Sequence, residues 1–281
     1  MSTVYLNGEY VPKDRAMISV DDRGFLLSDG IYEVTPAYRG RLFRMEQHMS
    51  RLRHGLDALR IDFDAAGLPE MHADLIAAND LAAEEVAIVY LQITRGVAPR
   101  THHFPPEGNP PTVYAFAQPY LRPDPARWEL GYEAITVPDD RWARVDIKSI
   151  GLLPNVLAQQ AAVDAGVADA LLVKDGIALE GSHNNVFAVF GGVVTTHPAT
   201  HQILHGVTRA YVMELAREQG LAVEERPVAL EEMRDADEIF FTGTTTEVRP
   251  TVRLDGEPVG DGKVGPVAKS LCEAFKAGTH G

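Results

Sequence analysis

The stretch Val145-Asp146-Ile147-Lys148-Ser149-Ile150-Gly151-Leu152-Leu153 places one lysine inside a largely apolar run. The other five lysines lie in turn-like settings or on one stripe of a C-terminal helical pattern, where an ammonium group stays in water. Burial of an ammonium group is costly and favours the neutral amine. A neutral amine is the nucleophile that forms a Schiff base with a carbonyl group, so Lys148 is a candidate anchor for a carbonyl cofactor. The alternative interpretation is that Lys148 snorkels to the surface or pairs with Asp146 or a distant carboxylate.

The composition restricts the class of protein and its partners. A length of 281 residues is enough for one large or two ordinary domains. The formal net charge of -14 argues against nucleic acid or an anionic membrane as the main partner, because either would require a basic patch. The first residues carry neither a basic region nor an apolar run, and no segment approaches the length of a membrane span, so we expect a cytoplasmic protein. The single cysteine, Cys272, excludes an intrachain disulfide and a zinc-type cysteine cluster.

The first part of the chain reads as strands, two helices and a long loop. Apolar residues at helical spacing predict a helix over residues 44–59, and a second helix is expected over 68–79. A loop over residues 95–111 contains five prolines and is too long to serve only as a connection. Strands are expected at the following segments: 3–6, 9–11, 30–38, 86–94 and 112–117.

A proline-rich segment beginning at Gln118 favours an extended linker. We therefore predict an N-terminal domain over residues 1–118, a linker over 119–130 and a C-terminal domain over 131–281. In the C-terminal domain, helices are expected over 155–164 and 207–219, each followed by a glycine. Strands are expected there at the following segments: 134–137, 170–173, 186–190, 193–196 and 238–241.

Two segments could bind a phosphate group. The sequence His205-Gly206-Val207-Thr208-Arg209 opens a helix, whose free amides and positive dipole end attract anions. The hydroxyl-rich sequence Thr242-Gly243-Thr244-Thr245-Thr246 follows a predicted buried strand. Each segment also has an ordinary interpretation, as a helix cap or as a plain turn.

Two further segments carry charged groups suited to a pyridine ring and to a carboxylate. Glu180 stands at a strand end, where an inward carboxylate could keep a pyridine nitrogen protonated and so make the ring a better electron sink. Arg100 and His102 are two residues apart in the long loop, and arginine is well shaped to grip a carboxylate. The adjacent His102 and His103 would point to opposite sides of an extended chain, so we expect no metal site there.

Taken together, these segments resemble the class IV pyridoxal-phosphate aminotransferases, and most closely their D-amino-acid transaminases. The resemblance covers almost the whole chain, and its motifs occur in the same order. The matching segments are Tyr5-Leu6-Asn7-Gly8, Asp22-Arg23-Gly24-Phe25, Asp29-Gly30-Ile31-Tyr32-Glu33, Asp146-Ile147-Lys148-Ser149, Leu153-Pro154-Asn155-Val156-Leu157, Glu180-Gly181-Ser182, Asn185-Val186-Phe187 and Gly206-Val207-Thr208-Arg209.

The resemblance implies a fold, a cofactor and a site. The fold is the α+β arrangement of fold type IV, with a smaller N-terminal α/β sandwich and a larger C-terminal domain that contains a mixed, barrel-like sheet. The cofactor is pyridoxal 5'-phosphate, which Lys148 would hold as an internal aldimine while Glu180 pairs with the ring nitrogen. The residues implied for the phosphate are Arg51, Val207, Thr208, Thr244 and Thr245, beside Gly206 at the helix start.

The same resemblance implies the substrates and the assembly. Arg100 and His102 would reach over from the partner subunit of a homodimer and, with Tyr32, trap the substrate carboxylate. The reaction would transfer the amino group of a D-amino acid such as D-alanine to 2-oxoglutarate. A branched-chain or (R)-amine transaminase, an aminodeoxychorismate lyase and a non-enzymatic pyridoxal-phosphate binding protein are the alternatives. Two segments depart from the family pattern, Leu26-Leu27-Ser28 and His183-Asn184, and we expect them to line the cofactor's face or the side-chain pocket and so to affect the substrate range.

Overall fold

The computed structural model describes residues 2–280, with the backbone alone for His280. The chain forms two compact units. Unit 1 comprises residues 2–121 and 147–151, and unit 2 comprises residues 122–146 and 152–280. The sequence-based division places the segment Ile147–Gly151, which carries Lys148, in the C-terminal domain, whereas its contacts are with unit 1. Among the described helices, none is long and apolar enough to cross a membrane.

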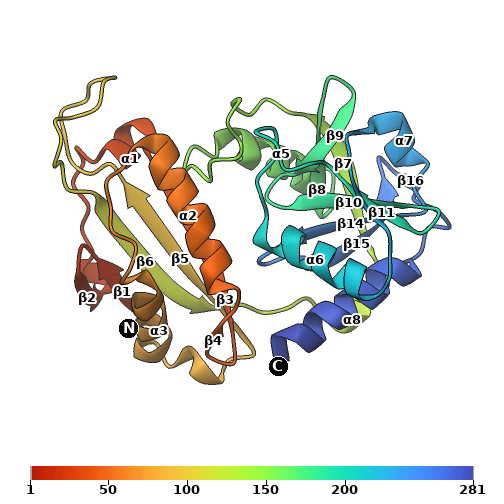
Figure 1. The fold of residues 1–281 in the computed structure, drawn as a ribbon, viewed down its shortest axis with the longest axis horizontal. Helices are drawn as coiled ribbons and strands as arrows, with labels where there is room; N and C mark the ends of the chain where they lie inside the picture. The colour runs from red at the N-terminus through yellow and green to blue at the C-terminus, as the bar shows by residue number, and fades with distance from the viewer. Residues whose placement is uncertain (1, 281) are drawn as a thin grey trace. The chain divides into compact units, whose positions relative to one another are not determined.

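Unit 1 is built on one six-stranded antiparallel sheet with the strand order β2-β1-β6-β5-β3-β4 (Figure 1). Asn7 and Gly8, both at positive φ, form the tight turn between the first two strands. The strands are β1 (Thr3–Leu6), β2 (Glu9–Pro12), β3 (Gly30–Tyr38), β4 (Arg41–Leu42), β5 (Val86–Thr94) and β6 (Thr112–Pro119). The helices are α1 (Arg23–Leu27), α2 (Met45–Leu59) and α3 (Leu68–Ala78), with short 3-10 turns η1 (Lys13–Arg15) and η2 (Leu81–Ala83).

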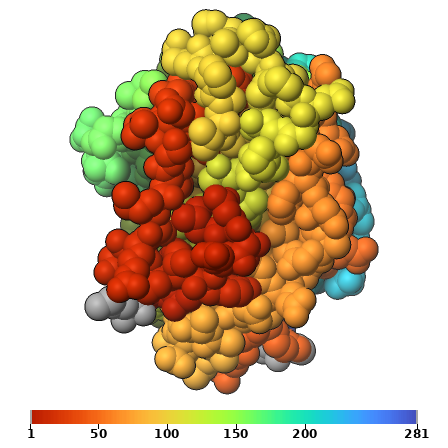
Figure 2. Space-filling model, turned by 90° about the vertical axis from the view of Figure 1, so that its left-hand side faces the viewer, coloured from red at the N-terminus to blue at the C-terminus, as the bar shows by residue number. Residues whose placement is uncertain are grey.

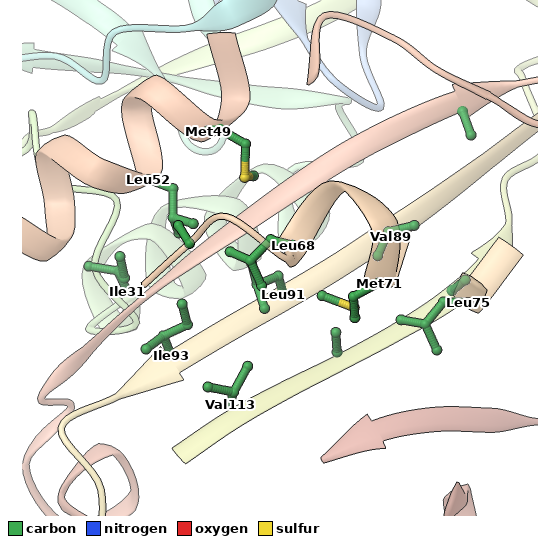
Figure 3. Packing of buried hydrophobic residues seen from close by; sticks show 14 of the residues in the cluster. Ile31, Met49, Leu52, Leu68, Met71, Leu75, Val89, Leu91, Ile93 and Val113 are labelled. Atoms are coloured by element: carbon green, nitrogen blue, oxygen red, sulfur yellow. The ribbon is translucent and has the colours of Figure 1, made fainter. Parts of the chain in front are cut away.

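Helices α2 and α3 form the core of unit 1 with the sheet, as Figure 3 shows. Met49, Leu52 and Leu56 recur at helical spacing along α2, and all three are buried. They pack with strand residues that include Ile31 and Val89. The apolar stripe read from the sequence therefore fixes which face of α2 meets the sheet.

Unit 2 contains a closed barrel of six strands. The chain of pairings β10-β14-β15-β7-β8-β9 is closed by an additional pairing of β9 with β10. The pairs β15–β7 and β7–β8 are parallel and the others are antiparallel. The six strands are β7 (Tyr132–Pro138), β8 (Asp169–Lys174), β9 (Ile177–Gly181), β10 (Asn185–Phe190), β14 (Glu238–Gly243) and β15 (Glu247–Leu254). The mixed barrel of unit 2 and the α/β arrangement of unit 1 together confirm the predicted α+β fold.

Shorter strands and five helices complete unit 2 (Figure 1). A cluster that includes Leu171, Ala188 and Phe241 fills a hydrophobic core, and the rings of Phe187 and Phe240 stack with their centroids 5.0 Å apart. The additional strands are β11 (Val193–Thr196), β12 (Val223–Glu225), β13 (Val228–Ala229) and β16 (Glu257–Pro258). The helices are α4 (Pro125–Glu129), α5 (Leu153–Asp164), α6 (Val207–Glu218), α7 (Leu230–Arg234) and α8 (Pro266–His280).

Candidate active site

Lys148 lies in a short segment that pairs with the beginning of β3. The amide of Tyr32 donates to the carbonyl of Lys148 at 3.0 Å, and the amide of Ile150 donates to the carbonyl of Gly30 at 3.1 Å. Ile147 anchors this segment in the core of unit 1. The Lys148 side chain is half-buried, and its Nζ lies 4.2 Å from the centroid of the Tyr32 ring. Within unit 1, as far as it is described, no carboxylate forms an ion pair with Lys148, and the aromatic face of Tyr32 is a favourable neighbour for its amine.

Tyr32 belongs to an aromatic row on the sheet of unit 1. Its ring stacks on Tyr90 with a centroid distance of 5.7 Å, and Tyr90 stacks in turn on Phe116 at 5.2 Å. The three residues lie on the neighbouring strands β3, β5 and β6, so cross-strand packing fixes the position of the Tyr32 ring. The Lys148 amine therefore sits against a rigid surface.

Arg51 is held on α2 by a buried carboxylate of β3. Its Nε donates to Glu33 Oε2 at 2.9 Å and its Nη2 to Glu33 Oε1 at 2.5 Å. His48 Nδ1 lies 3.1 Å from the same Oε1. Burial opposes charge on Glu33, but Arg51 and His48 outweigh it and hold the pKa of this carboxyl well below its usual range. Burial lowers the pKa of His48, against the attraction of Glu33.

Arg100 and His102 lie in the loop between β5 and β6, and both side chains are exposed. Over the described residues of the chain, neither side chain has a hydrogen-bond or ion-pair partner, and neither forms a hydrogen bond or a ring contact with Tyr32. Figure 2 shows this loop, in yellow, beside N-terminal residues in red, and Asp22 and Val97 form a β-bridge between the two segments. In the part of the chain that is described, no group of three His, Cys, Asp or Glu side chains could hold a metal ion.

Glu180 lies on β9 with its side chain buried inside unit 2. Its carboxylate accepts hydrogen bonds from Arg141 Nη1, from Asn185 Nδ2 at 2.7 Å and from the amide of Leu204 at 3.1 Å. Burial raises the pKa of Glu180, although the guanidinium of Arg141 acts in the opposite direction. A carboxylate that is desolvated in this way is strongly stabilised by a cation placed next to it.

Arg141 is a site residue that the sequence analysis missed. It follows β7 and is also bound by Asp139, to which its Nε donates at 2.8 Å and its Nη2 at 3.0 Å. Burial lowers the pKa of Arg141, but the carboxylates of Glu180 and Asp139 outweigh this effect and raise it above its usual value. The only signal in the sequence is an arginine two residues after an aspartate at a strand end, which is too common to predict a contact with Glu180.

Asn185 connects Glu180 to the start of α6. Its Nδ2 donates to Glu180 Oε2 and also to the carbonyl of Leu204 at 2.9 Å. The backbone of Gly206 comes so close that an added Cβ would lie 2.0 Å from Asn185 Oδ1. Only glycine fits at this position without a shift of the asparagine. The segment before α6 is therefore held against the barrel end that carries Glu180.

The beginning of α6 has the features of an anion-binding site. Gly206 is the N-cap residue and supplies no capping side chain, and Val207 and Thr208 are buried in the first turn. The first amides of a helix have no partner within the helix, and the helix dipole is positive there. These amides and the Thr208 hydroxyl suit a phosphate group.

Thr244 and Thr245 lie in the turn between β14 and β15 and are half-buried. In the sheet, Asn185 pairs with Glu180 of β9 on one side and with Thr242 of β14 on the other. The threonine turn therefore lies at the same end of the barrel as Glu180 and the start of α6. Thr242 Oγ1 is buried and has no hydrogen-bond partner among the described residues. A buried carboxylate and a phosphate-sized cradle at one barrel end fit the ring nitrogen and phosphate of pyridoxal phosphate.

The amino-acid sequence and the fold both match known aminotransferases. Residues 30–254 match the family model described as amino-transferase class IV. The chain is 38% identical over 278 residues to a D-alanine aminotransferase of Staphylococcus aureus strain MSSA476. The aligned residues cover 98% of this chain and 97% of that protein.

Among solved structures, the branched-chain amino acid aminotransferase of Escherichia coli superposes with a TM-score of 0.89 at 28% identity, covering 98% of this chain and 94% of that one. The T.th. branched-chain amino acid aminotransferase, complexed with N-(5'-phosphopyridoxyl)-L-glutamate, gives a TM-score of 0.86 at 27% identity, with 99% and 94% coverage. These matches confirm the family that the motifs predict. The chain belongs to the class IV aminotransferases and is a pyridoxal-5'-phosphate-dependent enzyme.

Proposed function

We propose that this aminotransferase transfers the amino group of a D-amino acid, such as D-alanine, to 2-oxoglutarate. The observation that carries transamination itself is the buried Glu180 carboxylate, bound by Arg141 and Asn185 at the barrel end that also carries the uncapped start of α6. The similarity to D-alanine aminotransferase over nearly the full chain supports the choice of donor.

Each residue has a distinct role in this proposal. Pyridoxal phosphate, when bound, supplies a carbonyl group for amines and a protonated ring that withdraws electrons from the substrate alpha carbon. Lys148 would hold the cofactor through its Nζ, and when the substrate amine has displaced that Nζ, the free amine would carry the proton that leaves the alpha carbon. Glu180 keeps the ring nitrogen protonated.

The family resemblance assigns the phosphate to the start of α6, to the threonine turn after β14 and to Arg51. Gly206, Val207 and Thr208 offer backbone amides and a hydroxyl, and Thr244 and Thr245 offer hydroxyls. Arg51 adds a positive charge, and its ion pair with Glu33 restricts its orientation.

The substrate carboxylate is assigned to Tyr32 together with Arg100 and His102 of a partner subunit. Exposed apolar side chains on unit 1 support a homodimer, because adjoining exposed apolar side chains are typical of a surface that a partner covers. Ile18, Val20 and Phe25 of this surface also line a pocket of about 250 Å³. The exposed large apolar residues in the described part of unit 1 are Tyr10, Met17, Ile18, Val20, Phe25, Val97, Phe104 and Leu121. A cytoplasmic location remains a prediction from the sequence.

A branched-chain amino acid donor is the second candidate. It is favoured by the similarity to branched-chain aminotransferase structures, at TM-scores of 0.86 and 0.89. The two candidates share the roles of Lys148 and Glu180 and differ in the residues that bind the donor.

Mixing the purified enzyme separately with D-alanine, L-leucine and (R)-1-phenylethylamine tests the proposal. The loss of the visible absorbance of the lysine-bound cofactor reports conversion by each donor. We expect D-alanine to convert the cofactor fastest and 2-oxoglutarate to restore it. Fastest conversion by L-leucine would replace the proposed donor with the second candidate, and no conversion by any donor would contradict transamination itself.

A further inference from the structure

Two arginines of unit 1 share the carboxylate of Asp29, the residue that precedes β3. Arg23 Nε donates to Asp29 Oδ2 at 2.8 Å. Arg95 Nε donates to the same oxygen at 2.8 Å, and Arg95 Nη2 donates to Oδ1 at 3.0 Å. Burial opposes charge on Asp29, but the two guanidinium groups lower the pKa of this carboxyl below its usual value. We call these three residues the Asp29 cluster.

Arg95 connects the cluster to the beginning of the long loop and to the end of α2. Its Nη2 donates to the carbonyl of Leu59 at 2.7 Å and its Nη1 to that of Arg60 at 3.1 Å. These carbonyls lie at the helix C-terminus, where a positive charge is favourable. Phe104 follows Arg100 and His102 in the sequence. Its ring packs over the guanidinium of Arg95, whose Cζ lies 3.7 Å from the ring centroid.

Arg23 connects the same cluster to the middle of the loop. Its Nη1 donates to the carbonyl of Thr101 at 2.8 Å, and Thr101 lies between Arg100 and His102 in the sequence. The loop base is also closed by Asn109, whose Nδ2 donates to the carbonyl of Arg95 at 2.6 Å. The loop that carries both exposed side chains is therefore held at Thr101 by Arg23 and at Phe104 by Arg95. Both arginines bind the carboxylate of Asp29.

The geometry points to Asp29 as a positioning residue that fixes the Arg100–His102 backbone in the conformation that receives the substrate carboxylate. This inference rests on the proposed function, in which those two side chains bind the carboxylate. Arg23 and Arg95 are both directed by Asp29, so its charge is required to keep each guanidinium aimed at the loop. Ordering the loop before the substrate arrives removes an entropic cost from binding.

Asp29→Asn tests the inference, because it keeps the size of the side chain and removes the charge that two arginines share. We expect the KM for D-alanine to rise about tenfold while kcat changes less than threefold, since Asp29 acts on binding of the carboxylate and not on proton transfer. The loss of kcat/KM in Asp29→Asn cannot exceed the loss in Arg100→Ala, because Asp29 acts through Arg100 and His102. For Arg100→Ala we expect a loss of about 30- to 1000-fold in kcat/KM, since a charge-assisted contact is removed. In an Arg100→Ala, His102→Ala background, Asp29→Asn should then change kcat/KM less than twofold.

Asp255→Asn is the matched control. Asp255 lies in unit 2, accepts hydrogen bonds from the amide and hydroxyl of Thr136 at 2.7 and 2.9 Å, and pairs with Arg234. Its replacement should weaken the fold without raising the KM for D-alanine. If Asp29→Asn does not fold, Phe104→Ala, which releases one tie at an exposed side chain, should raise the KM in the same direction.

Two results would overturn the inference. One is an unchanged KM in both Asp29→Asn and Phe104→Ala. The other is a full effect of Asp29→Asn in the background without Arg100 and His102, because the aspartate would then act only on the fold. Failure of the proposed function gives a different result, since the wild-type enzyme would not convert D-alanine. In that case the same comparison with L-leucine decides whether Asp29 positions the loop.

Discussion

Replacing Glu180 by glutamine tests the centre of the proposed site. The change keeps the side-chain shape and removes the charge. One of the two oxygens becomes an NH2 group, which cannot accept a hydrogen bond. Either the bond from Asn185 at 2.7 Å or the bond from Arg141 is then lost.

The expected loss of stability follows from the remaining contacts. A buried donor without a partner costs about 1–3 kcal/mol, whereas breaking a whole buried ion pair costs about 3–5 kcal/mol. Arg141 keeps its two bonds to Asp139, and glutamine avoids the burial cost that raises the pKa of Glu180. We therefore expect the free energy of unfolding to fall by about 2 kcal/mol, which corresponds to a Tm lower by roughly 4–8 °C.

The expected loss of activity is larger than this loss of stability implies. A neutral amide cannot hold a proton on the ring nitrogen, so kcat for D-alanine and 2-oxoglutarate should fall on the order of 100- to 1000-fold, the range seen when one electrostatic group is removed from an active site. Steady-state kinetics at saturating cofactor measures this change, and thermal unfolding of the same preparations measures the stability.

Glu238→Gln is the matched control. Glu238 is another buried carboxylate of unit 2, and it accepts the amides of Val267 at 3.0 Å and Ala268 at 2.8 Å at the start of α8. The Glu238→Gln variant should lose about as much stability as Glu180→Gln. It should retain kcat within about threefold, because Glu238 touches none of the proposed site residues. If Glu180→Gln retains as much kcat as Glu238→Gln, the assignment of Glu180 to the ring nitrogen is wrong.

Three further predictions concern other residues. Lys148→Ala should abolish turnover and the cofactor absorbance that borohydride removes, and normal turnover would disprove the anchor. Arg100→Ala should cost about 2–4 kcal/mol of transition-state binding for D-alanine, and an unchanged kcat/KM would remove Arg100 from the carboxylate site. His72 is buried on α3, and this burial lowers its pKa to about 4. Because the unfolded state binds the proton more tightly, the free energy of unfolding falls as the pH drops from about 6.5 to about 4. Urea unfolding of the wild type should lose about 3 kcal/mol more over this range than that of His72→Leu, and parallel losses would refute the assignment.

The sequence predicts local elements well in this chain because their signals are local. The apolar spacing on α2 and the glycines after α5 and α6 place those helices to within a few residues, and Gly166 and Gly220 both have positive φ. The short helix α1 was missed, since it depends on one capping contact from Asp22 and a left-handed residue at Ser28.

Contacts between distant segments could not be predicted in the same way. The barrel closes through the pairing of Asn185 with Glu180, and no single strand carries a signal for this closure. Arg141 reaches Glu180 across 39 residues of sequence. The importance of Asp29 was hidden for the same reason, because its two arginines come from opposite sides of it in the sequence and from 6 and 66 residues away.

The placement of Ile147–Gly151 in unit 1 has a consequence for synthesis on the ribosome. Unit 1 consists of residues 2–121 and this short return segment, so the first 121 residues emerge without Ile147 in their core and without the Lys148 carbonyl that receives the Tyr32 amide. The nascent chain completes unit 1 only after a stretch of unit 2 has been translated. The Lys148 side chain is thus added to unit 1 after Tyr32, Tyr90 and Phe116, the residues of the aromatic row, have all been translated.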